Sequence, residues 1–271
     1  MGPVYRKISK NNATFQELQS LASNRNRRFR EGRFLVEGVK PLNRLAERKW
    51  GVDALLVREG AASAWASGYA DRVGPGTVYE VSPDLMAQLS GKEGDSELIA
   101  VAKAPDLDPG RLPSVETGVF VVADRPNSPG NLGSLVRSAE ALGAAGVLTY
   151  GHAADFFDPK CVRASIGALF SIPLAHLDSE DDFHRWLAGL AAANAPVQVA
   201  AMDENGTMDA WQLNKAGLTV LIVGNETNGL SRAFKEACTA VVRIPMVGSS
   251  TSLNAANSGS ILLYELLVRP R

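Results

Sequence analysis

The stretch "STSLNAANSGSILLYE", residues 250–265, joins two halves with opposite helix preferences. Its second half, residues 261–265, is apolar and favours a helix. The first half carries small polar side chains: Ser252, Asn254, Asn257 and Ser258. Such side chains hydrogen-bond to nearby backbone and favour caps and turns over helix interiors. The first half is therefore expected to face a ligand and a tightly packed neighbour rather than the core.

Upstream of this stretch, apolar runs alternate with amphipathic helices. Runs without polar alternation are predicted to be strands at residues 118–124, 145–150, 171–177, 196–202, 218–224 and 240–245. Residues 131–144 and 179–194 place their apolar side chains at helical spacing. Continuous apolar strands are typical of a parallel sheet that is covered on both faces. Residues 118–271 are therefore predicted to form an α/β domain with a mainly parallel sheet.

A smaller α/β domain is predicted at residues 1–104, followed by a linker at residues 105–117. Its strands are expected at residues 33–38, 53–59 and 97–103, and its helices at residues 14–22, 39–51 and 82–91. Thr14 and Glu17 have capping-box spacing, Gly51 is expected to close the second helix, and Ser82 to cap the third. The linker is rich in proline and poor in apolar side chains.

The composition argues against membrane and metal chemistry. The 271 residues are 45% hydrophobic and contain no run of about 18 uncharged apolar residues. The first residues lack the apolar stretch of a signal peptide, so a cytoplasmic location is expected. Cys161 and Cys238 are far apart and the three histidines are scattered, so no metal site is predicted.

The charge is distributed unevenly along the chain. Residues 1–50 hold 12 Lys and Arg against 4 Asp and Glu, which leaves 16 against 25 for the remainder. Five arginines are interleaved with Phe29 and Phe34: Arg25, Arg27, Arg28, Arg30 and Arg33. This pattern suits phosphate contact and base stacking, and it predicts RNA binding. A solvated helix end is the alternative interpretation.

Three polar loops follow strands of the predicted parallel sheet, where such sheets bind ligands. The first loop contains Gly130 and Gly133 and leads into a helix, whose N-terminus is a natural anion site. Two turns into that helix, Arg137 lies on the same side as these glycines and could hold a phosphate, although an ordinary exposed arginine fits as well. The glycines do not form the dinucleotide-binding pattern G-x-G-x-x-G.

The second and third loops add further polar groups. In "LIVGNETNGLS", residues 221–231, Gly224 permits close approach of a ligand, and a turn then presents Asn225, Glu226 and Asn228 before a helix near Ser231. The third loop begins at Ile244, is expected to turn at Gly248, and leads into a helix predicted to start near Ser252, whose polar face directs Ser252 and Asn254 into the same space.

Three ordered blocks, "NLGSLVRSA", "VGNETNGLS" and "IPMVGSSTSLNAANS", resemble the motifs of the SpoU (TrmH-like) family of RNA ribose 2'-O-methyltransferases in the SPOUT superfamily. The likeness covers most of residues 118–268, and the N-terminal part resembles an L30e-like RNA-binding module. Within the family, "GHAADFFDPK" and "SLNAAN" look most like the avilamycin-resistance type of 23S rRNA methyltransferase.

This resemblance implies a trefoil knot that binds S-adenosylmethionine (AdoMet), a homodimer, and 23S rRNA as the substrate. It implies that Gly224, Asn225, Ile244, Met246, Ser252 and Leu253 bind the cofactor. It also implies catalytic roles for Arg137, Asn131, Glu226, Ser252 and Asn254. An arginine is an unusual base because its pKa exceeds about 12, so both positioning and proton removal stay open for Arg137.

Three alternatives to this function remain. One is a tRNA ribose methyltransferase. A second is an RNA-binding protein with an inactive knot domain, against which the intact motif residues argue. The third is a nucleotide-dependent Rossmann enzyme, against which the missing glycine fingerprint argues.

Overall fold

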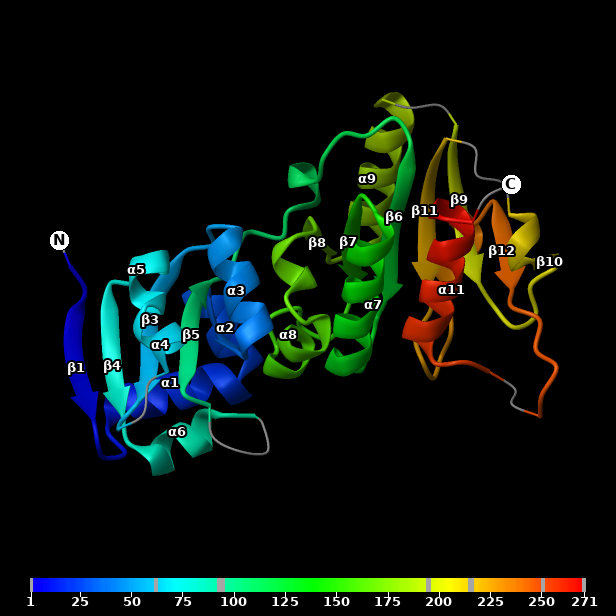
Figure 1. Cartoon of the computed structure of the whole chain (residues 1–271). Coiled ribbons are helices and arrows are strands. Elements are labelled where there is room, and N and C mark those ends of the chain that lie inside the picture. The colour runs from blue at the N-terminus through cyan, green and yellow to red at the C-terminus, as the bar shows by residue number, and fades with distance from the viewer. Residues whose placement is uncertain are drawn as a thin grey trace. The chain divides into compact units, whose positions relative to one another are not determined.

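Two compact units make up the chain in the computed structural model (Figure 1), which describes residues 2–60, 63–91, 96–193, 196–213, 217–249 and 252–269. The first unit comprises Met1–Pro105 together with Asp155–Ser171, and the second comprises Asp106–Ala154 together with Ile172–Arg271. Each unit combines a β-sheet with helices. This confirms the predicted α/β class.

The sheet of the first unit is mixed and has the order β1-β4-β3-β5-β2. Its strands are β1 (Val4–Ile8), β2 (Arg33–Glu37), β3 (Val52–Arg58), β4 (Thr77–Val81) and β5 (Leu98–Lys103). β1 and β3 run parallel to β4, whereas β5 runs antiparallel to both β3 and β2. β2, β3 and β5 were predicted. β1 and β4 were missed. Four of the five residues of β1 are exposed, and β4 has only two buried residues, Val78 and Val81, so neither strand gives a continuous buried apolar run.

The helices of the first unit begin and end partly at other residues than predicted. They are α1 (Ala13–Ser23), α2 (Arg25–Glu31), α3 (Val39–Glu47), α4 (Ala64–Ser67), α5 (Tyr69–Val73), α6 (Pro83–Leu89), α8 (Pro159–Ser165) and the 3-10 turn η2 (Ala168–Phe170). Asn12, not Thr14, caps α1 by accepting a hydrogen bond from the amide of Phe15. α3 ends at Glu47 with Arg48 as its C-cap, rather than at Gly51. Ser82 does precede α6, as predicted.

Residues 155–171 pack within the first unit, although the predicted boundaries place them in the C-terminal domain. The ring of Phe157 lies 4.6 Å from that of Phe34, between ring centroids. The Arg28 guanidinium forms an ion pair with Asp155, with Nε 2.7 Å from Oδ2. The chain therefore leaves the second unit after residue 154 and returns to it at residue 172.

The sheet of the second unit has seven strands in the order β10-β12-β9-β11-β6-β7-β8, and every neighbouring pair is parallel. The strands are β6 (Gly118–Asp124), β7 (Gly146–Tyr150), β8 (Leu174–Leu177), β9 (Val197–Met202), β10 (Met208–Asp209), β11 (Leu218–Val223) and β12 (Ala240–Arg243). This confirms the predicted parallel sheet. The two-residue strand β10 was not predicted. Residues 105–117, predicted as a linker, include the 3-10 turn η1 (Pro109–Arg111) and join the sheet where Leu107 accepts a hydrogen bond from the His176 amide.

Helices cover both faces of this sheet. They are α7 (Pro129–Leu142), α9 (Glu180–Ala193), α10 (Arg232–Ala237) and α11 (Ala255–Leu267), with the 3-10 turn η3 (Ala210–Gln212). Phe120 and Val122 of β6 share a core with Phe183 of α9 and Phe234 of α10. Because side chains alternate along a strand, the residues between them face the other side. There α11 packs against α7, β6 and β11.

The described part of the stretch at residues 250–265 forms a helix cap and a surface that packs against α7. Asn254 is the N-cap of α11, and its Oδ1 accepts hydrogen bonds from the amides of Ala256 and Asn257. A Cβ on Gly259 would lie 2.6 Å from Cδ1 of Leu135 of α7, so any larger residue would force the Leu135 side chain to move. The hydroxyl of Ser260 donates to that of Ser138 of α7 at 2.6 Å. The small residues thus allow α7 and α11 to approach closely.

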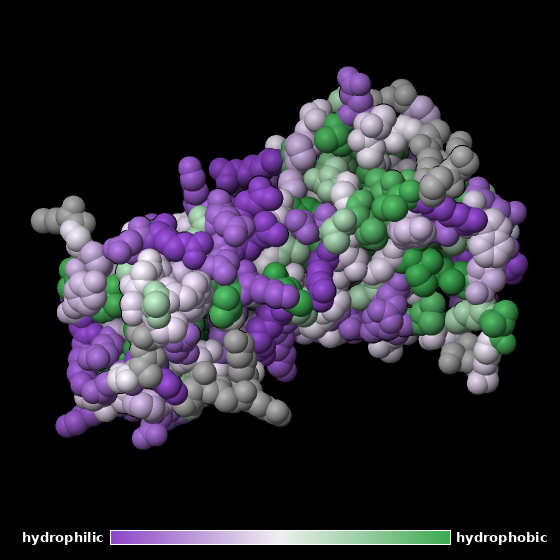
Figure 2. All heavy atoms as spheres, in the orientation of Figure 1, coloured by the Kyte–Doolittle hydropathy of each residue, from purple (hydrophilic) through white to green (hydrophobic). Residues whose placement is uncertain are grey.

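The outer face of α11 is apolar. Ile261, Tyr264 and Val268 are exposed, and Figure 2 shows hydrophobic residues where Figure 1 draws this helix. The predicted threading of the tail through an earlier loop stays a prediction, since Ser250 and Thr251 on that path lie outside the described residues.

Candidate active site

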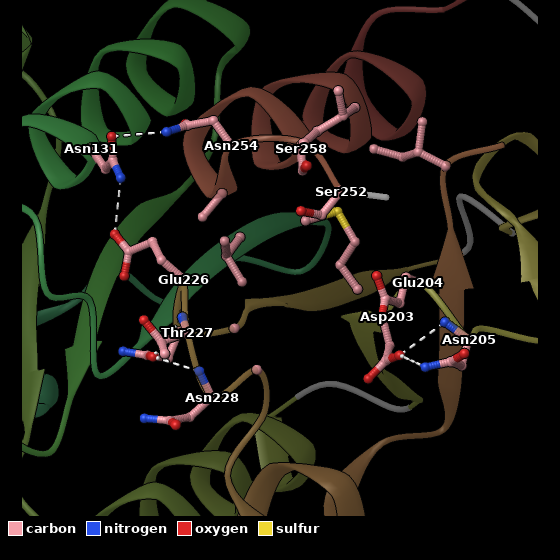
Figure 3. A pocket seen from close by; sticks show the side chains of 18 of the residues that line it. Asn131, Asp203, Glu204, Asn205, Glu226, Thr227, Asn228, Ser252, Asn254 and Ser258 are labelled. Carbon is pink, nitrogen blue, oxygen red and sulfur yellow. Dashed lines mark hydrogen bonds between the residues drawn. The ribbon is translucent and has the colours of Figure 1, made fainter. Parts of the chain in front are cut away.

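A cavity of about 750 Å³ opens at the carboxyl ends of β9, β11 and β12 (Figure 3). Nine of the predicted site residues line it: Asn131, Gly224, Asn225, Glu226, Ile244, Met246, Ser252, Leu253 and Asn254. They come from the start of α7, from the loop after β11 and from the segment that leads into α11. Segments up to 127 positions apart in the sequence therefore meet around one space.

A chain of hydrogen bonds crosses one wall of the cavity. The Asn254 side-chain amide donates to Oδ1 of Asn131 at 3.0 Å, and Nδ2 of Asn131 donates to Oε1 of Glu226 at 3.0 Å (Figure 3). The second carboxylate oxygen of Glu226 accepts from the amide of Asn127 at 3.1 Å. Both ends of the Asn131 amide are used, which fixes its orientation. The start of α7, the β11 loop and the α11 cap are thereby held together.

Glu226 is kept ionised by this network. Partial burial raises its pKa, but hydrogen bonds from the Asn131 side chain and from backbone amides, including those of Asn127 and Ser128, lower it more. The net pKa lies below its ordinary value of 4.5. At neutral pH the cavity therefore contains a fixed negative charge, which favours a cationic ligand.

The loop after β11 is a tight turn closed by Asn225. Its Oδ1 accepts from the amides of Thr227 and Asn228, and its backbone exchanges two hydrogen bonds with Gly229. A Cβ on Gly224 would lie 3.0 Å from the carbonyl carbon of Gly229. Glycine is needed there because the protein's own turn passes close by, a reason different from the predicted approach of a ligand.

Asp124, at the end of β6, connects the loop after β6 to the loop after β11. Its carboxylate is fully buried and accepts from the Ser231 amide at 2.5 Å and from Nε of Arg125 at 2.8 Å. Arg125 also donates to the carbonyl of Gly229 at 3.3 Å. This ion pair ties the end of β6 to the turn after β11. It was not predicted, because an Asp-Arg dipeptide at a strand end has no distinctive pattern.

The remaining wall of the cavity is apolar. Met246 and Leu253 are exposed in the chain by itself, and both line the cavity together with Ile244. Exposed apolar side chains gathered at a cavity are typical of a binding site for a small ligand with an aromatic group. Ser252 and Leu253 precede α11, which begins at Ala255 rather than near Ser252 as predicted.

Arg137 is placed apart from these residues. It lies on the exposed side of α7 and does not line the cavity. Within the described ranges its guanidinium makes no hydrogen bond or ion pair. Arg137 therefore lies outside the set of side chains that line the cavity.

The basic stretch forms α2 and the start of β2, and the structure corrects the prediction for one of its members. Arg28 is only 3% exposed and pairs with Asp155, so it is unavailable to RNA. Arg27 pairs with Glu31, and Arg33 pairs with both Glu17 and Glu31. Two further arginines remain at the surface: Arg25, whose guanidinium lies 5.1 Å from the Phe29 ring centroid, and the exposed Arg30.

The cavity also contains groups that were not predicted. Asp203, Glu204 and Asn205 follow β9 and line it opposite Asn131 (Figure 3). β9 pairs with β11, so the rule that ligands lie beyond the carboxyl ends of parallel strands could have found them. Across the described residues, no helix is long and apolar enough to cross a membrane, and no group of three potential metal ligands occurs.

Comparisons with known proteins agree with this arrangement. The chain is 43% identical to the 23S rRNA (uridine(2479)-2'-O)-methyltransferase of Streptomyces viridochromogenes over 97% of its own length and 92% of that protein. The crystal structure of the SpoU methyltransferase AviRb from this organism, in complex with AdoMet, superposes with a TM-score of 0.90 at 42% identity, covering 95% of this chain and 97% of that one. An AdoMet-bound rRNA methyltransferase from Sinorhizobium meliloti superposes with a TM-score of 0.86 at 26% identity, with 97% of each chain covered.

The family models account for both units. The SpoU L30e-like domain matches residues 12–100, and the SpoU rRNA Methylase family matches residues 118–264. Since the second match covers more than half of the chain and contains every residue that lines the cavity, the chain belongs to the SpoU rRNA methylase family.

Proposed function

We propose that this protein transfers a methyl group from AdoMet to a ribose 2'-hydroxyl of 23S rRNA in the cytoplasm. The observation that carries the proposal is the meeting of Asn131, Glu226 and Asn254 with an apolar wall around one cavity. The full-length relative from Streptomyces viridochromogenes, which acts on a uridine of 23S rRNA, supports the choice of RNA and of nucleotide.

The cavity suits AdoMet chemically. The cofactor supplies a methyl group on a positively charged sulfur, which is a good leaving group. Ile244, Met246 and Leu253 offer apolar surface for its adenine, and the ionised Glu226 offers a negative charge near the reacting centre. No acid catalyst is needed for the leaving group, so positioning and removal of the hydroxyl proton dominate the barrier. The fixed Asn131 amide is suited to positioning.

Arg137 is proposed to act at the cavity of a second copy of the chain. It belongs to the same pair of helices as the exposed apolar face of Ile261, Tyr264 and Val268. A homodimer that covers this face would bury the apolar side chains and would complete the site with a guanidinium. There Arg137 would hold an RNA phosphate and the attacking hydroxyl.

RNA docking is proposed for the surface part of the basic stretch. Arg30 is exposed and can reach a phosphate, Arg25 adds positive charge beside the Phe29 ring, and this half-exposed ring can stack on a base. Arg27 and Arg33 contribute less, since each already pairs with glutamate.

The central experiment is methyl transfer from labelled AdoMet to 23S rRNA, with mapping of the 2'-O-methyl position. Transfer to a 23S uridine is expected, whereas transfer only to tRNA, or AdoMet binding without any transfer, would favour the alternative functions. Arg137→Ala is expected to retain AdoMet binding and to lose transfer. Expression in a sensitive bacterium, followed by growth in avilamycin, tests the proposed role in resistance.

A mixed dimer tests the placement of Arg137. Neither Arg137→Ala nor Asn254→Ala protein is expected to be active by itself. A dimer with one chain of each kind contains one intact cavity facing one intact Arg137, so activity is expected to return. Tyr264→Glu places a charge on the face that the proposed dimer buries, so this variant is expected to be monomeric. A site shared between chains is wrong if the mixture stays inactive and Tyr264→Glu still forms a dimer.

A further inference from the structure

Asp203 lies at the cavity, and the proposed transfer reaction uses none of its groups. It follows the last residue of β9, and Ala201 of that strand pairs with Ile222 of β11. The parallel register brings Asp203 level with Gly224 at the carboxyl edge of the sheet. Figure 3 shows it on the wall across the cavity from Asn131 and Glu226.

The turn that carries Asp203 is held firmly. The Asp203 amide donates to the carbonyl of Val242 at 3.0 Å, and the Gly206 amide donates back to the Asp203 carbonyl at 3.0 Å. A Cβ on Gly206 would lie 2.6 Å from the carbonyl carbon of Val242, so the turn sits directly on β12. The backbone at Asp203 is therefore fixed by the sheet.

One of the two carboxylate oxygens of Asp203 accepts hydrogen bonds from the described residues. Its Oδ1 accepts from the backbone amide of Asn205 at 2.9 Å and from the Asn205 side chain at 3.2 Å. In the described part of the chain, its Oδ2 has no hydrogen-bond partner. Asn205 thus orients the carboxylate and leaves one oxygen as an acceptor at the cavity.

The position of Asp203 selects the part of AdoMet that it meets. The proposed function puts the 2'-hydroxyl at the wall of Asn131 and Glu226, so the reactive methyl group would face that wall. The opposite wall then faces the adenosine part, whose vicinal ribose hydroxyls are the donors that a carboxylate at a strand end binds in other α/β sheets. We propose that Oδ2 of Asp203 accepts a hydrogen bond from a ribose hydroxyl of AdoMet. This rests on the proposed use of AdoMet and adds a cofactor-binding residue to it.

The neighbouring Glu204 provides a matched control. It lines the same cavity and carries the same charge, but its side chain is exposed and forms no hydrogen bond or ion pair with the described residues. Glu204→Gln therefore removes one charge from the same turn without removing an oriented acceptor. Asp203→Asn keeps the size of the side chain and the oxygen that binds Asn205, and it replaces only the free oxygen by an amide nitrogen.

The experiment is calorimetric titration of the full chain without RNA, so its readout is affinity rather than activity. The ligands are AdoMet, S-adenosylhomocysteine, methylthioadenosine, and S-adenosylhomocysteine analogues that lack the 2' or the 3' hydroxyl. For Asp203→Asn we expect affinity for the first three ligands to fall by a similar factor of about 10, as for one hydrogen bond to a charged group. Glu204→Gln should change each affinity less than about twofold, since an exposed charge contributes little.

Several results would overturn the proposal. Equal affinity of wild-type protein for S-adenosylhomocysteine and for both deoxy analogues excludes ribose recognition, whatever the variants do. Loss of AdoMet affinity alone indicates contact with the sulfonium, and loss of AdoMet and S-adenosylhomocysteine without methylthioadenosine indicates contact with the ammonium group. If Asp203→Asn binds all of these ligands with wild-type affinity, Asp203 does not bind the cofactor. Failure of wild-type protein to bind AdoMet would instead overturn the proposed function.

Discussion

Arg28→Ala is expected to destabilise the first unit strongly, although Arg28 belongs to a stretch whose pattern predicts RNA binding. The side chains of Arg28 and Asp155 are each 3% exposed, and their charged atoms lie 2.7 Å apart. Arg28 also donates to the carbonyl of Leu21 at 3.0 Å. Removing one partner of a buried ion pair leaves the other charge uncompensated and costs about 3–5 kcal/mol. Solvent screening reduces this little, because both groups are buried.

Urea unfolding followed by circular dichroism, with hydrogen exchange of residues 155–171, measures the effect. Arg30→Ala is the control, since Arg30 is an exposed arginine of the same helix and its removal should change stability by less than about 0.5 kcal/mol. Conversely, Arg30→Ala should weaken RNA binding while the fold is retained. The reasoning is refuted if Arg28→Ala and Arg30→Ala unfold at the same urea concentration.

Three further predictions concern packing, pH and thiol reactivity. Gly259→Ala should lower the free energy of unfolding by about 1–3 kcal/mol, because the new Cβ would lie 2.6 Å from an α7 side chain. Gly189→Ala, at a position of α9 with open space around it, should raise the free energy of unfolding by up to about 1 kcal/mol. Thermal melting of the two variants checks this. Because the pKa of Glu226 is lowered in the folded protein, its hydrogen bonds stabilise the fold above pH 4.5, and this contribution disappears as pH falls through the lowered pKa. The difference in unfolding free energy between wild type and Asn131→Ala should therefore shrink in acid. A pH-independent difference would contradict this. Burial raises the pKa of Cys238 to about 11 from 9.0, so at pH 8 it should react with a disulfide reagent about 100-fold more slowly than an unperturbed thiol, and rapid labelling would show that the thiol is accessible.

The parallel sheet was predictable because its strands are buried on both faces. β6 has the predicted limits, residues 118–124, and β11 differs from its prediction by one residue. Such strands consist of continuous apolar runs, which hardly depend on the rest of the fold. β1 was missed for the opposite reason, since an exposed edge strand has no apolar run. The α1 cap was misplaced because Asn12 and Thr14 are both good caps, and only the geometry distinguishes them.

The candidate site was predictable to the extent that its residues belong to motifs. Asn131, Glu226 and Asn254 were named from three separate blocks, and the structure joins them by hydrogen bonds. Arg28 was misassigned because its partner Asp155 is 127 residues away, and a local pattern of charge contains no information about such a partner. Asp203 was missed because its turn has no motif, although its position directly after a predicted strand places it at the edge of the sheet where ligands bind.

The path of residues 155–171 has a consequence for biosynthesis. These residues supply Phe157 and the partner of Arg28 to the first unit, yet they are translated after the first two strands of the second unit. The N-terminal half therefore cannot reach its final packing on the ribosome until residue 171 has left the exit tunnel. A gene fragment cut at residue 105 would yield an incomplete core, so these two units could not have been exchanged between proteins as independent modules without carrying this internal segment along.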